Sequence, residues 1–283
     1  MDMKTVLITG CSSGFGKLTA QTFHANGWNV IATMRSPETE TELTQLDDVL
    51  VTRLDVTEPE SARQAVDEGL SRFGAIHVLV NNAGFGGHAL FEQFPDETVR
   101  AMYDTNVFGL MNVTRAVLPH MRRRNEGCVI NVTSISGLLG TPTSSVYSST
   151  KFALEGLTEA LALEYGPLNI RFKTVAPGAY PTTRFRENTD SPIDAGGERL
   201  SAYAGDLRGQ IQAISQRLAS PEGTPADPQE VADRIYECAT SDTPVHNPVG
   251  KDAEMLVGMM NGADSRQAFL DQLEAMLAPQ TDT

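Results

Sequence analysis

Short apolar runs alternate with helix-length segments along most of this 283-residue chain. The runs are rich in Val, Ile and Leu with little polar alternation, which predicts strands buried on both faces. They occupy residues 5–9, 29–34, 49–55, 76–81, 128–133 and 170–176. The helix-length segments occupy residues 15–26, 38–46, 59–73, 99–124 and 147–166. This alternation predicts an α/β fold with right-handed crossovers and a parallel sheet covered by helices on both faces.

The composition changes after residue 178. Residues 179–226 are rich in Pro, Gly, Ser, Thr and charged side chains, which is typical of a substrate lid, here with one helix near 198–219. Beyond it we expect a helix at 228–240, a short strand at 253–257 and a closing helix at 263–277. The sequence therefore predicts one doubly wound, three-layer Rossmann domain over residues 1–283, with an inserted lid.

The charge and cysteine content limit the partners. The formal net charge is −14 with histidines neutral, so the surface repels phosphate backbones and anionic lipids. We expect neither nucleic acid nor a membrane as a partner, since no run has the roughly 18 apolar residues of a membrane span and the N-terminus lacks signal-peptide features. Three scattered cysteines (Cys11, Cys128 and Cys238) and five dispersed histidines favour reduced thiols, no metal site and a cytoplasmic protein.

A glycine-rich loop follows the first predicted strand and opens the first helix. It reads Thr9-Gly10-Cys11-Ser12-Ser13-Gly14-Phe15-Gly16. Gly10 permits a tight turn, Gly14 lets the backbone approach a pyrophosphate, and Gly16 permits close helix–strand packing. The N–H groups at the helix start and the positive end of its dipole favour an anion. In this context the loop predicts a dinucleotide site rather than a turn that binds nothing.

The end of the second predicted strand bears on which dinucleotide binds. NAD-binding chains commonly place an acid about 20 residues past the glycines. Here Met34 and Arg35 come first, and no carboxylate appears until Glu38. A guanidinium suits a 2′-phosphate, so Arg35 favours NADP, although NAD stays possible if Arg35 is only a solvated loop residue.

Tyr147 and Lys151 stand four residues apart in a segment of helical periodicity, which places them on one helix face. An isolated tyrosine has a pKa near 10. A neighbouring ammonium, helped by an oxidised nicotinamide, should lower that pKa and allow acid–base chemistry. On its own such a pair is mostly surface decoration.

Two further residues accompany the pair. Ser134 follows the fifth predicted strand, where ligands of parallel sheets sit, and can hydrogen-bond a substrate oxygen. Asn106 and Gly109 weaken the interior of a long predicted helix. A local kink that frees a carbonyl for a proton-relay water would explain both residues; helix-surface polarity is the alternative.

With these motifs the chain resembles the short-chain dehydrogenase/reductase family, nearest its hydroxysteroid and retinol dehydrogenase-like branch. The Thr-Gly-x-x-x-Gly-x-Gly loop, Asn81-Asn82-Ala83-Gly84, the Asn–Ser–Tyr–Lys order and Pro177-Gly178 carry the resemblance over about residues 4–180. Phe15 stands where Ile is more usual. Ser13 stands at the family's other basic position, so a preference for NADP depends largely on Arg35 and loop hydroxyls.

The resemblance implies a role for each site residue. Tyr147 is the general acid/base and Ser134 orients the carbonyl or alcohol, while Lys151 lowers the tyrosine pKa and holds the nicotinamide ribose. Asn106 maintains the proton relay. The implied cofactor-binding residues are Gly10, Ser12, Ser13, Gly14, Phe15, Gly16, Arg35, Asp55, Val56, Asn82, Ala83, Gly84, Tyr147, Lys151, Pro177, Gly178 and Thr182.

The expected function is NADP-dependent interconversion of a carbonyl and an alcohol, on a hydrophobic ketone or secondary alcohol. The alternatives are an NAD-dependent dehydrogenase of a polar alcohol or sugar, and a non-catalytic dinucleotide-sensing regulator. We expect a homodimer or homotetramer that pairs through the helices of residues 99–124 and 147–166. The candidate substrate-pocket residues are Phe85, His88, Leu90, Phe91, Leu138, Leu139, Tyr180 and Phe185.

Overall fold

A parallel sheet organises the computed structural model, which describes residues 3–180, 197–220 and 225–277. In these residues seven strands pair in the order β3-β2-β1-β4-β5-β6-β7. They are β1 Thr5–Thr9, β2 Asn29–Met34, β3 Val49–Arg53, β4 Val78–Asn81, β5 Gly127–Val132, β6 Ile170–Pro177 and β7 His246–Val249. Every pairing is parallel, and the strand order reverses between β1 and β4. The predicted Rossmann-type α/β fold is confirmed.

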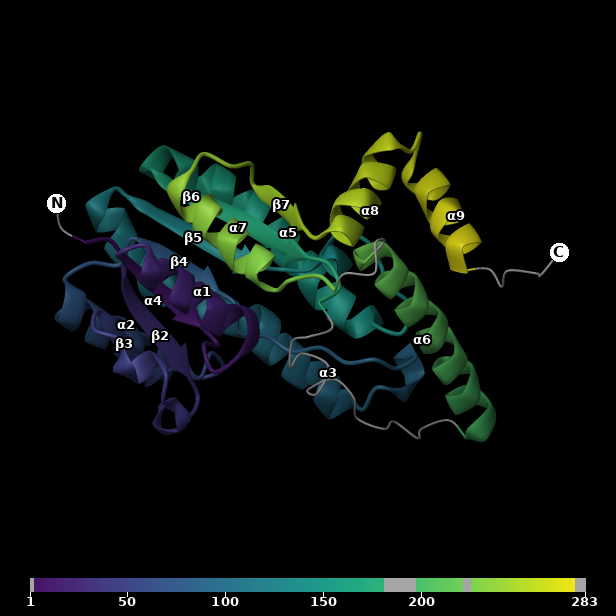
Figure 1. The fold of residues 1–283 in the computed structure, drawn as a ribbon, viewed down its shortest axis with the longest axis horizontal. Helices are drawn as coiled ribbons and strands as arrows, with labels where there is room; N and C mark the ends of the chain where they lie inside the picture. Colours follow the sequence, from purple (N-terminus) through teal and green to yellow (C-terminus); the bar gives the residue numbers. More distant parts are fainter. Residues whose placement is uncertain (1–2, 181–196, 221–224, 278–283) are drawn as a thin grey trace.

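Helices cover both faces of the sheet (Figure 1). Helices α1 (Gly14–Ala25) and α7 (Gln229–Thr240) bury Phe23 and Ile235 against one face. Helices α2 (Pro59–Phe73), α4 (Leu110–Arg124) and α5 (Ser145–Tyr165) cover the other face. The strands β1, β2, β4 and β5 are buried at every position, because each face of the sheet carries its own apolar layer.

Two predicted helices are interrupted. Residues 38–46 form two 3₁₀ turns, η1 (Pro37–Thr39) and η2 (Leu43–Gln45), instead of one helix. The Glu40 carboxylate accepts the N–H groups of Glu42 (2.8 Å) and Leu43 (3.0 Å), which ends the first turn and begins the second. The segment 99–124 is also divided, into α3 (Asp96–Tyr103), a π-helical stretch η4 (Asp104–Gly109) and α4.

The expected strand at 253–257 is wrong. Those residues lie inside helix α8 (Lys251–Gly262). The last strand in the described part of the chain is β7, which contains Pro248 and ends at Val249, four residues before the predicted strand begins. A proline is tolerated there because β7 is the edge strand of the sheet. The apolar run Met255-Leu256-Val257 reads as a short strand, but it belongs to a helix with one buried end.

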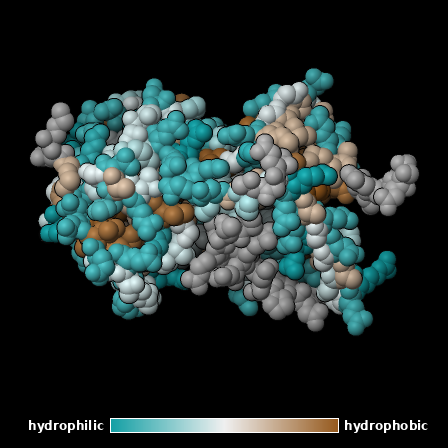
Figure 2. All heavy atoms as spheres, in the orientation of Figure 1, coloured by the Kyte–Doolittle hydropathy of each residue, from teal (hydrophilic) through white to brown (hydrophobic). Residues whose placement is uncertain are grey.

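Three of the helices that follow β6, in residues 198–219, 251–262 and 266–277, lie beyond one end of the sheet (Figure 1). Helix α6 (Glu198–Ala219) forms as expected, and α9 (Arg266–Leu277) closes the described chain. Helix α8 contacts both α6 and α9. Figure 2 shows hydrophobic residues gathered over this region. In the described ranges no helix is long and apolar enough to cross a membrane.

We predict that Phe172→Ala lowers the free energy of unfolding by about 3–5 kcal/mol, the usual cost of emptying a buried aromatic site. Phe172 is 2% exposed on β6 and lies 5.6 Å from the Tyr165 ring, centroid to centroid. Urea denaturation measures the loss. Phe91, 74% exposed, is the matched control, and Phe91→Ala should change stability by less than about 0.5 kcal/mol. Equal losses in the two variants would contradict this packing.

Candidate active site

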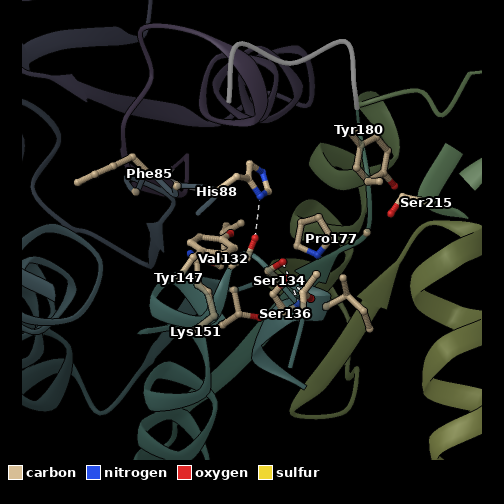
Figure 3. Close-up of a pocket in the computed structure, with 18 of the residues that line it drawn as sticks. Phe85, His88, Val132, Ser134, Ser136, Tyr147, Lys151, Pro177, Tyr180 and Ser215 are labelled. Carbon is tan, nitrogen blue, oxygen red and sulfur yellow. Dashed lines mark hydrogen bonds between the residues drawn. The ribbon is translucent and has the colours of Figure 1, made fainter. Parts of the chain in front are cut away.

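A cavity of about 1010 Å³ opens at the carboxyl end of the sheet. Segments far apart in sequence meet there, as expected where parallel strands end and their order reverses. Figure 3 shows Ser134, Tyr147, Lys151, Pro177 and His88 converging on this cavity. The predicted site residues that line it are Gly10, Ser12, Ser13, Gly14, Phe15, Arg35, Asp55, Val56, Asn82, Ala83, Gly84, Ser134, Tyr147, Lys151, Pro177 and Gly178.

The glycine loop forms one wall of the cavity. Gly14 begins α1 with a positive φ of 56°, and a Cβ there would meet nothing within 4 Å, so its backbone faces open space. The N-cap residue Ser13 makes no side-chain hydrogen bond to the helix among the described residues. The first N–H groups of α1 are therefore available for an anion at the positive end of the helix dipole.

Gly16 has a different task. It does not line the cavity; a Cβ at this position would collide with the Gly10 carbonyl and the Asn82 side chain. The prediction that it allows close helix–strand packing agrees with this geometry.

Arg35 and Asp55 stand at the opposite end of the glycine loop from Tyr147. Arg35 is exposed at the cavity wall after β2. Burial alone would raise the pKa of Asp55, but hydrogen bonds from the Thr57 hydroxyl (2.7 Å) and N–H (3.0 Å), with the nearby charge of Arg35, bring it below its usual value. Asp55 is thus a fixed carboxylate at the cavity edge.

The residues Asn81 to Gly84 brace the sheet. The Asn82 amide donates to the carbonyls of Thr9 (2.9 Å) and Gly10 (3.2 Å), which ties β4 to the glycine loop. The N–H groups of Asn82 and Ala83 both donate to the Thr9 hydroxyl at 3.0 Å. The Asn82 side chain therefore fixes the glycine loop against the end of β4 at the cavity wall.

Helix α5 delivers Tyr147 and Lys151 to the same cavity. Lys151 is 5% exposed and its ammonium donates to the Val132 carbonyl at 2.9 Å, at the end of β5. The ammonium also lies over the Tyr147 ring, 5.6 Å from the centroid. The Tyr147 phenol is hydrogen-bonded to the Ser134 side chain. Ser134 also accepts the N–H of Ser136 at 3.1 Å, which holds its hydroxyl in place.

The pKa of Tyr147 departs from the prediction. Burial raises it to about 12, and the hydrogen bond with Ser134 offsets only part of that rise. Lys151 does not lower it in this structure, because the ammonium faces the ring and bonds to a carbonyl rather than to the phenol oxygen. Burial has the opposite effect on Lys151, because there it destabilises a positive charge: it lowers the pKa to about 8, and the Glu155 carboxylate offsets only part of this decrease. The phenol is therefore protonated at neutral pH.

Asn106 lies behind the cavity wall, in the π-helical stretch η4. It is 1% exposed, and its amide oxygen accepts the Phe85 N–H at 3.0 Å. Its amide nitrogen donates to the Phe85 carbonyl (2.8 Å) and to the Thr150 hydroxyl (3.1 Å). The helix is interrupted where the sequence predicts a kink, and Asn106 uses the interruption to join the chain after β4 to α5.

A buried polar chain, which the sequence analysis missed, anchors α5 to the sheet. The Asn81 amide donates to Asn131 (2.9 Å) and to Thr114 (3.0 Å), and Asn131 donates to Thr158 (2.8 Å). This chain connects α4, β4, β5 and α5 beneath the catalytic residues. Its only sequence signal is one asparagine inside each of two apolar strands.

The cavity extends past Tyr147 to α6, which the sequence predicts as part of the substrate lid, and to α8 and α9, which the sequence did not assign to the site. Apolar residues of α6, α8 and α9 line it, among them Ile214, Leu256 and Leu273. Of the predicted pocket residues, Phe85, His88, Leu139 and Tyr180 line the cavity, whereas Leu90, Phe91 and Leu138 do not. Thr182 and Phe185 lie outside the described residues. The sequence signal that could have assigned α6 and α9 to the cavity is a row of apolar residues at positions i, i+3 and i+7 of each helix.

The described residues fit a dinucleotide. The open glycine cradle and helix start suit a pyrophosphate, Arg35 and Asp55 stand where an adenosine would lie, and Lys151 with Tyr147 stands where the nicotinamide end would lie. At the nicotinamide end the Gly178 N–H donates to the Val249 carbonyl (2.9 Å), and the Ala179 N–H donates to Asp252 (2.8 Å). Asp252, a residue the sequence analysis missed, therefore fixes the turn after β6.

Comparison with known proteins agrees with this site. The short chain dehydrogenase family matches residues 4–193. A 3-ketodihydrosphingosine reductase of Bacteroides thetaiotaomicron is 43% identical over 188 residues, which cover 66% of this chain and 68% of the relative. The chain belongs to the short-chain dehydrogenase/reductase family. It is an NAD(P)-dependent oxidoreductase that interconverts carbonyl and alcohol groups.

Solved structures show the same architecture. A short-chain dehydrogenase from Streptomyces avermitilis superposes with a TM-score of 0.78 at 32% identity, and the match covers 100% of both chains. ElxO, in a structure with NADP bound, superposes with a TM-score of 0.72 at 29% identity over 90% of this chain and 99% of its own. The fold resemblance thus extends through the C-terminal helices.

We predict that Lys151 loses its proton as pH rises through about 8, because burial destabilises the charged form. NMR of protein carrying ¹³C-labelled lysine should show one side-chain resonance that titrates there, and the Lys151→Met variant should lack it. A set of lysine resonances that all titrate above about 10, the ordinary range, would contradict the assignment.

Proposed function

We propose that the protein is an NADP(H)-dependent carbonyl reductase or alcohol dehydrogenase whose substrate is a hydrophobic ketone or secondary alcohol. The observation that carries this proposal is the placement of a partly buried, protonated Tyr147 beside Ser134 and Lys151, in the same cavity as the glycine loop. A regulator that only senses a dinucleotide would not need this proton donor.

Each residue has a defined part in carbonyl reduction. When bound, NADPH supplies the hydride that the carbonyl carbon accepts. The Ser134 hydroxyl hydrogen-bonds the carbonyl oxygen and orients it, and the Tyr147 phenol donates its proton to that oxygen. The Lys151 ammonium, fixed by its hydrogen bond to the Val132 carbonyl, holds the nicotinamide ribose. Because burial raises the pKa of Tyr147, the phenol holds the proton that reduction requires.

Asn106 does not line the cavity, but it holds the residues around the catalytic group in place. Its three hydrogen bonds fix η4 against Phe85 and Thr150, one position before Lys151. We assign it to the upkeep of a proton relay that returns a proton from solvent to Tyr147.

Arg35 supports NADP over NAD. Its guanidinium is exposed at the cavity wall after β2, near Asp55. A 2′-phosphate would meet an exposed positive side chain at this wall, and Ser12 and Ser13 of the glycine loop line the same cavity. The NADP complex of the structural relative ElxO is consistent with this preference.

The walls of the cavity support a hydrophobic substrate. Beyond Tyr147, eight of the thirteen residues that α6, α8 and α9 contribute to the lining are apolar, which favours a hydrophobic substrate over a polyol or sugar phosphate. The relative that is named for the reduction of 3-ketodihydrosphingosine acts on a compound of this kind.

Removal of the phenol hydroxyl separates chemistry from binding. Tyr147→Phe should lower kcat by about 10²–10⁴-fold, the usual contribution of a general acid, and leave the Kd for NADPH nearly unchanged. Steady-state kinetics with a ketone panel and calorimetric titration with NADPH measure the two effects. Substantial activity in this variant would contradict the mechanism.

Reversal of the charge at position 35 should change the cofactor preference. In Arg35→Asp the ratio of kcat/KM for NADPH to that for NADH should fall by about tenfold to a hundredfold, since a charge-assisted contact is replaced by repulsion. Arg63→Asp, on the exposed face of α2, is the matched control and should leave the ratio unchanged. A wild-type preference for NADH would show that Arg35 is a solvated loop residue.

Exposed apolar side chains support self-association. Phe108 on η4, and Phe152 and Leu163 on α5, are 52%, 40% and 81% exposed. They belong to the two segments that we expect to pair with their symmetry mates. Light scattering at micromolar concentration should give a dimer or a tetramer, and a strictly monomeric mass would refute the pairing.

A further inference from the structure

Helix α5 carries a second buried ionisable side chain, one turn after Lys151. Glu155 follows Lys151 by four residues, so the two side chains lie on the same helix face. Both residues are 5% exposed. Glu155 does not line the cavity, so it contacts neither substrate nor cofactor there. Glutamates are almost never enclosed to this degree unless they are paired, so the burial of Glu155 needs a physical reason.

The Glu155 carboxylate is held by a side chain of β7. Its Oε2 lies 2.8 Å from Nδ1 of His246, and Nε2 of the same imidazole lies 2.9 Å from Oε1 of Glu159. A carboxylate only accepts hydrogen bonds, so Nδ1 of His246 donates to Glu155. The His246 and Glu159 side chains are 37% and 61% exposed, whereas that of Glu155 is 6% exposed. His246 therefore fixes one oxygen of a buried carboxylate from the edge strand of the sheet.

The other oxygen of Glu155 lacks such a donor. Oε1 is buried and makes no hydrogen bond to the described residues. A buried carboxylate with an unused oxygen is costly, and an opposite charge nearby lowers that cost. The Lys151 ammonium, one turn away, is buried as well, and burial destabilises its charged form. Each of these two charges therefore makes the other easier to bury.

The other groups around Lys151 bring no charge at neutral pH. In the described part of the chain they are the Val132 carbonyl, Gly84, the Asn106 amide, the Gly137 backbone and the protonated Tyr147 phenol. Glu155 is the charged group that opposes the effect of burial on the Lys151 pKa. A change in the charge of Glu155 should therefore be measurable at Lys151.

We propose that Glu155 is a positioning residue for the catalytic ammonium: its carboxylate, held by His246, keeps Lys151 charged and so able to hold the nicotinamide ribose. This inference rests on the function proposed above, which gives Lys151 that role. Neither Glu155 nor His246 touches the reacting atoms. His246 acts on Glu155, and Glu155 acts on Lys151, so the residues that support the site extend from the cavity to β7.

The substitution Glu155→Gln removes the charge with little change in shape. The pKa of Lys151, followed by its ¹³C resonance, should fall from about 8 to about 7, because the ammonium loses the carboxylate that stabilises its charged form. Glu164→Gln makes the same substitution at an exposed position of α5 and is the matched control, which should leave that resonance unchanged. An unchanged Lys151 titration in Glu155→Gln would overturn the inference.

Cofactor affinity gives a second measurement. If Lys151 titrates near pH 7 in Glu155→Gln and near pH 8 in the wild type, the Kd for NADPH should be nearly equal in the two proteins at pH 6 and about threefold weaker in the variant at pH 7.5. Calorimetric titration at the two pH values measures this. A variant that is weaker by the same factor at both pH values would show a merely structural role and reject the proposal.

His246 offers an independent pair of variants. His246→Leu removes the donor to Glu155, so a charge on that carboxylate becomes unfavourable and the pKa of Lys151 should fall as it does in Glu155→Gln. His246→Gln keeps an amide donor and should retain more of the wild-type titration. If Glu155→Gln fails to fold, as judged by circular dichroism, this pair decides the matter: a wild-type Lys151 titration in His246→Leu would reject the inference.

The outcomes also distinguish this inference from the proposed function. The NMR titration needs no substrate, so it tests the coupling of Glu155 to Lys151 even if the protein reduces no ketone and the proposed function fails. Conversely, ketone reduction that is lost in Tyr147→Phe, together with a Lys151 pKa that ignores Glu155→Gln, would leave the proposed function intact and reject the inference.

Discussion

A buried ammonium holds this site together. Lys151 is almost fully enclosed, and its hydrogen bond to the Val132 carbonyl joins α5 to the end of β5. A charge in such a place is costly unless it is satisfied, which is why its pKa falls to about 8. The same ammonium lies over the Tyr147 ring, so the catalytic phenol and the end of β5 are held together through one side chain.

The supporting structure keeps that atom in place. The chain of Asn81, Asn131 and Thr158 fixes α5 to two central strands, and Asn106 fixes the same helix to the chain after β4. Both connections use buried amides whose bonds would be lost to water if the helix moved. A buried hydrogen-bond network of this type favours one arrangement over many, and one arrangement is what proton transfer at a fixed distance needs.

Local sequence signals were enough for most of the fold and for the chemistry-bearing residues. Apolar strands, the glycine loop and the Tyr147–Lys151 spacing depend on neighbours in sequence, so they could be read directly. The failures have physical causes of another kind. The Glu40 carboxylate accepts two backbone N–H groups and interrupts a helix that the apolar periodicity predicts. The run at 253–257 is helical, because β7 forms the edge strand of the sheet before this run begins. The raised pKa of Tyr147 depends on the burial of its hydroxyl, which only the assembled structure shows. The same is true of the wall built from α6 and α9, whose residues meet the cavity only after folding.

The central claim is that Tyr147 delivers a proton to a carbonyl oxygen while hydride reaches the carbon from the dinucleotide bound along the glycine loop. The most direct test is to supply NADPH that carries deuterium at the transferable position, together with a hydrophobic ketone that the enzyme reduces, and to analyse the alcohol by mass spectrometry. The account predicts one deuterium on the carbinol carbon of the product, with the hydroxyl proton drawn from solvent. An alcohol without the label, or oxidation of NADPH that yields no alcohol, would contradict it.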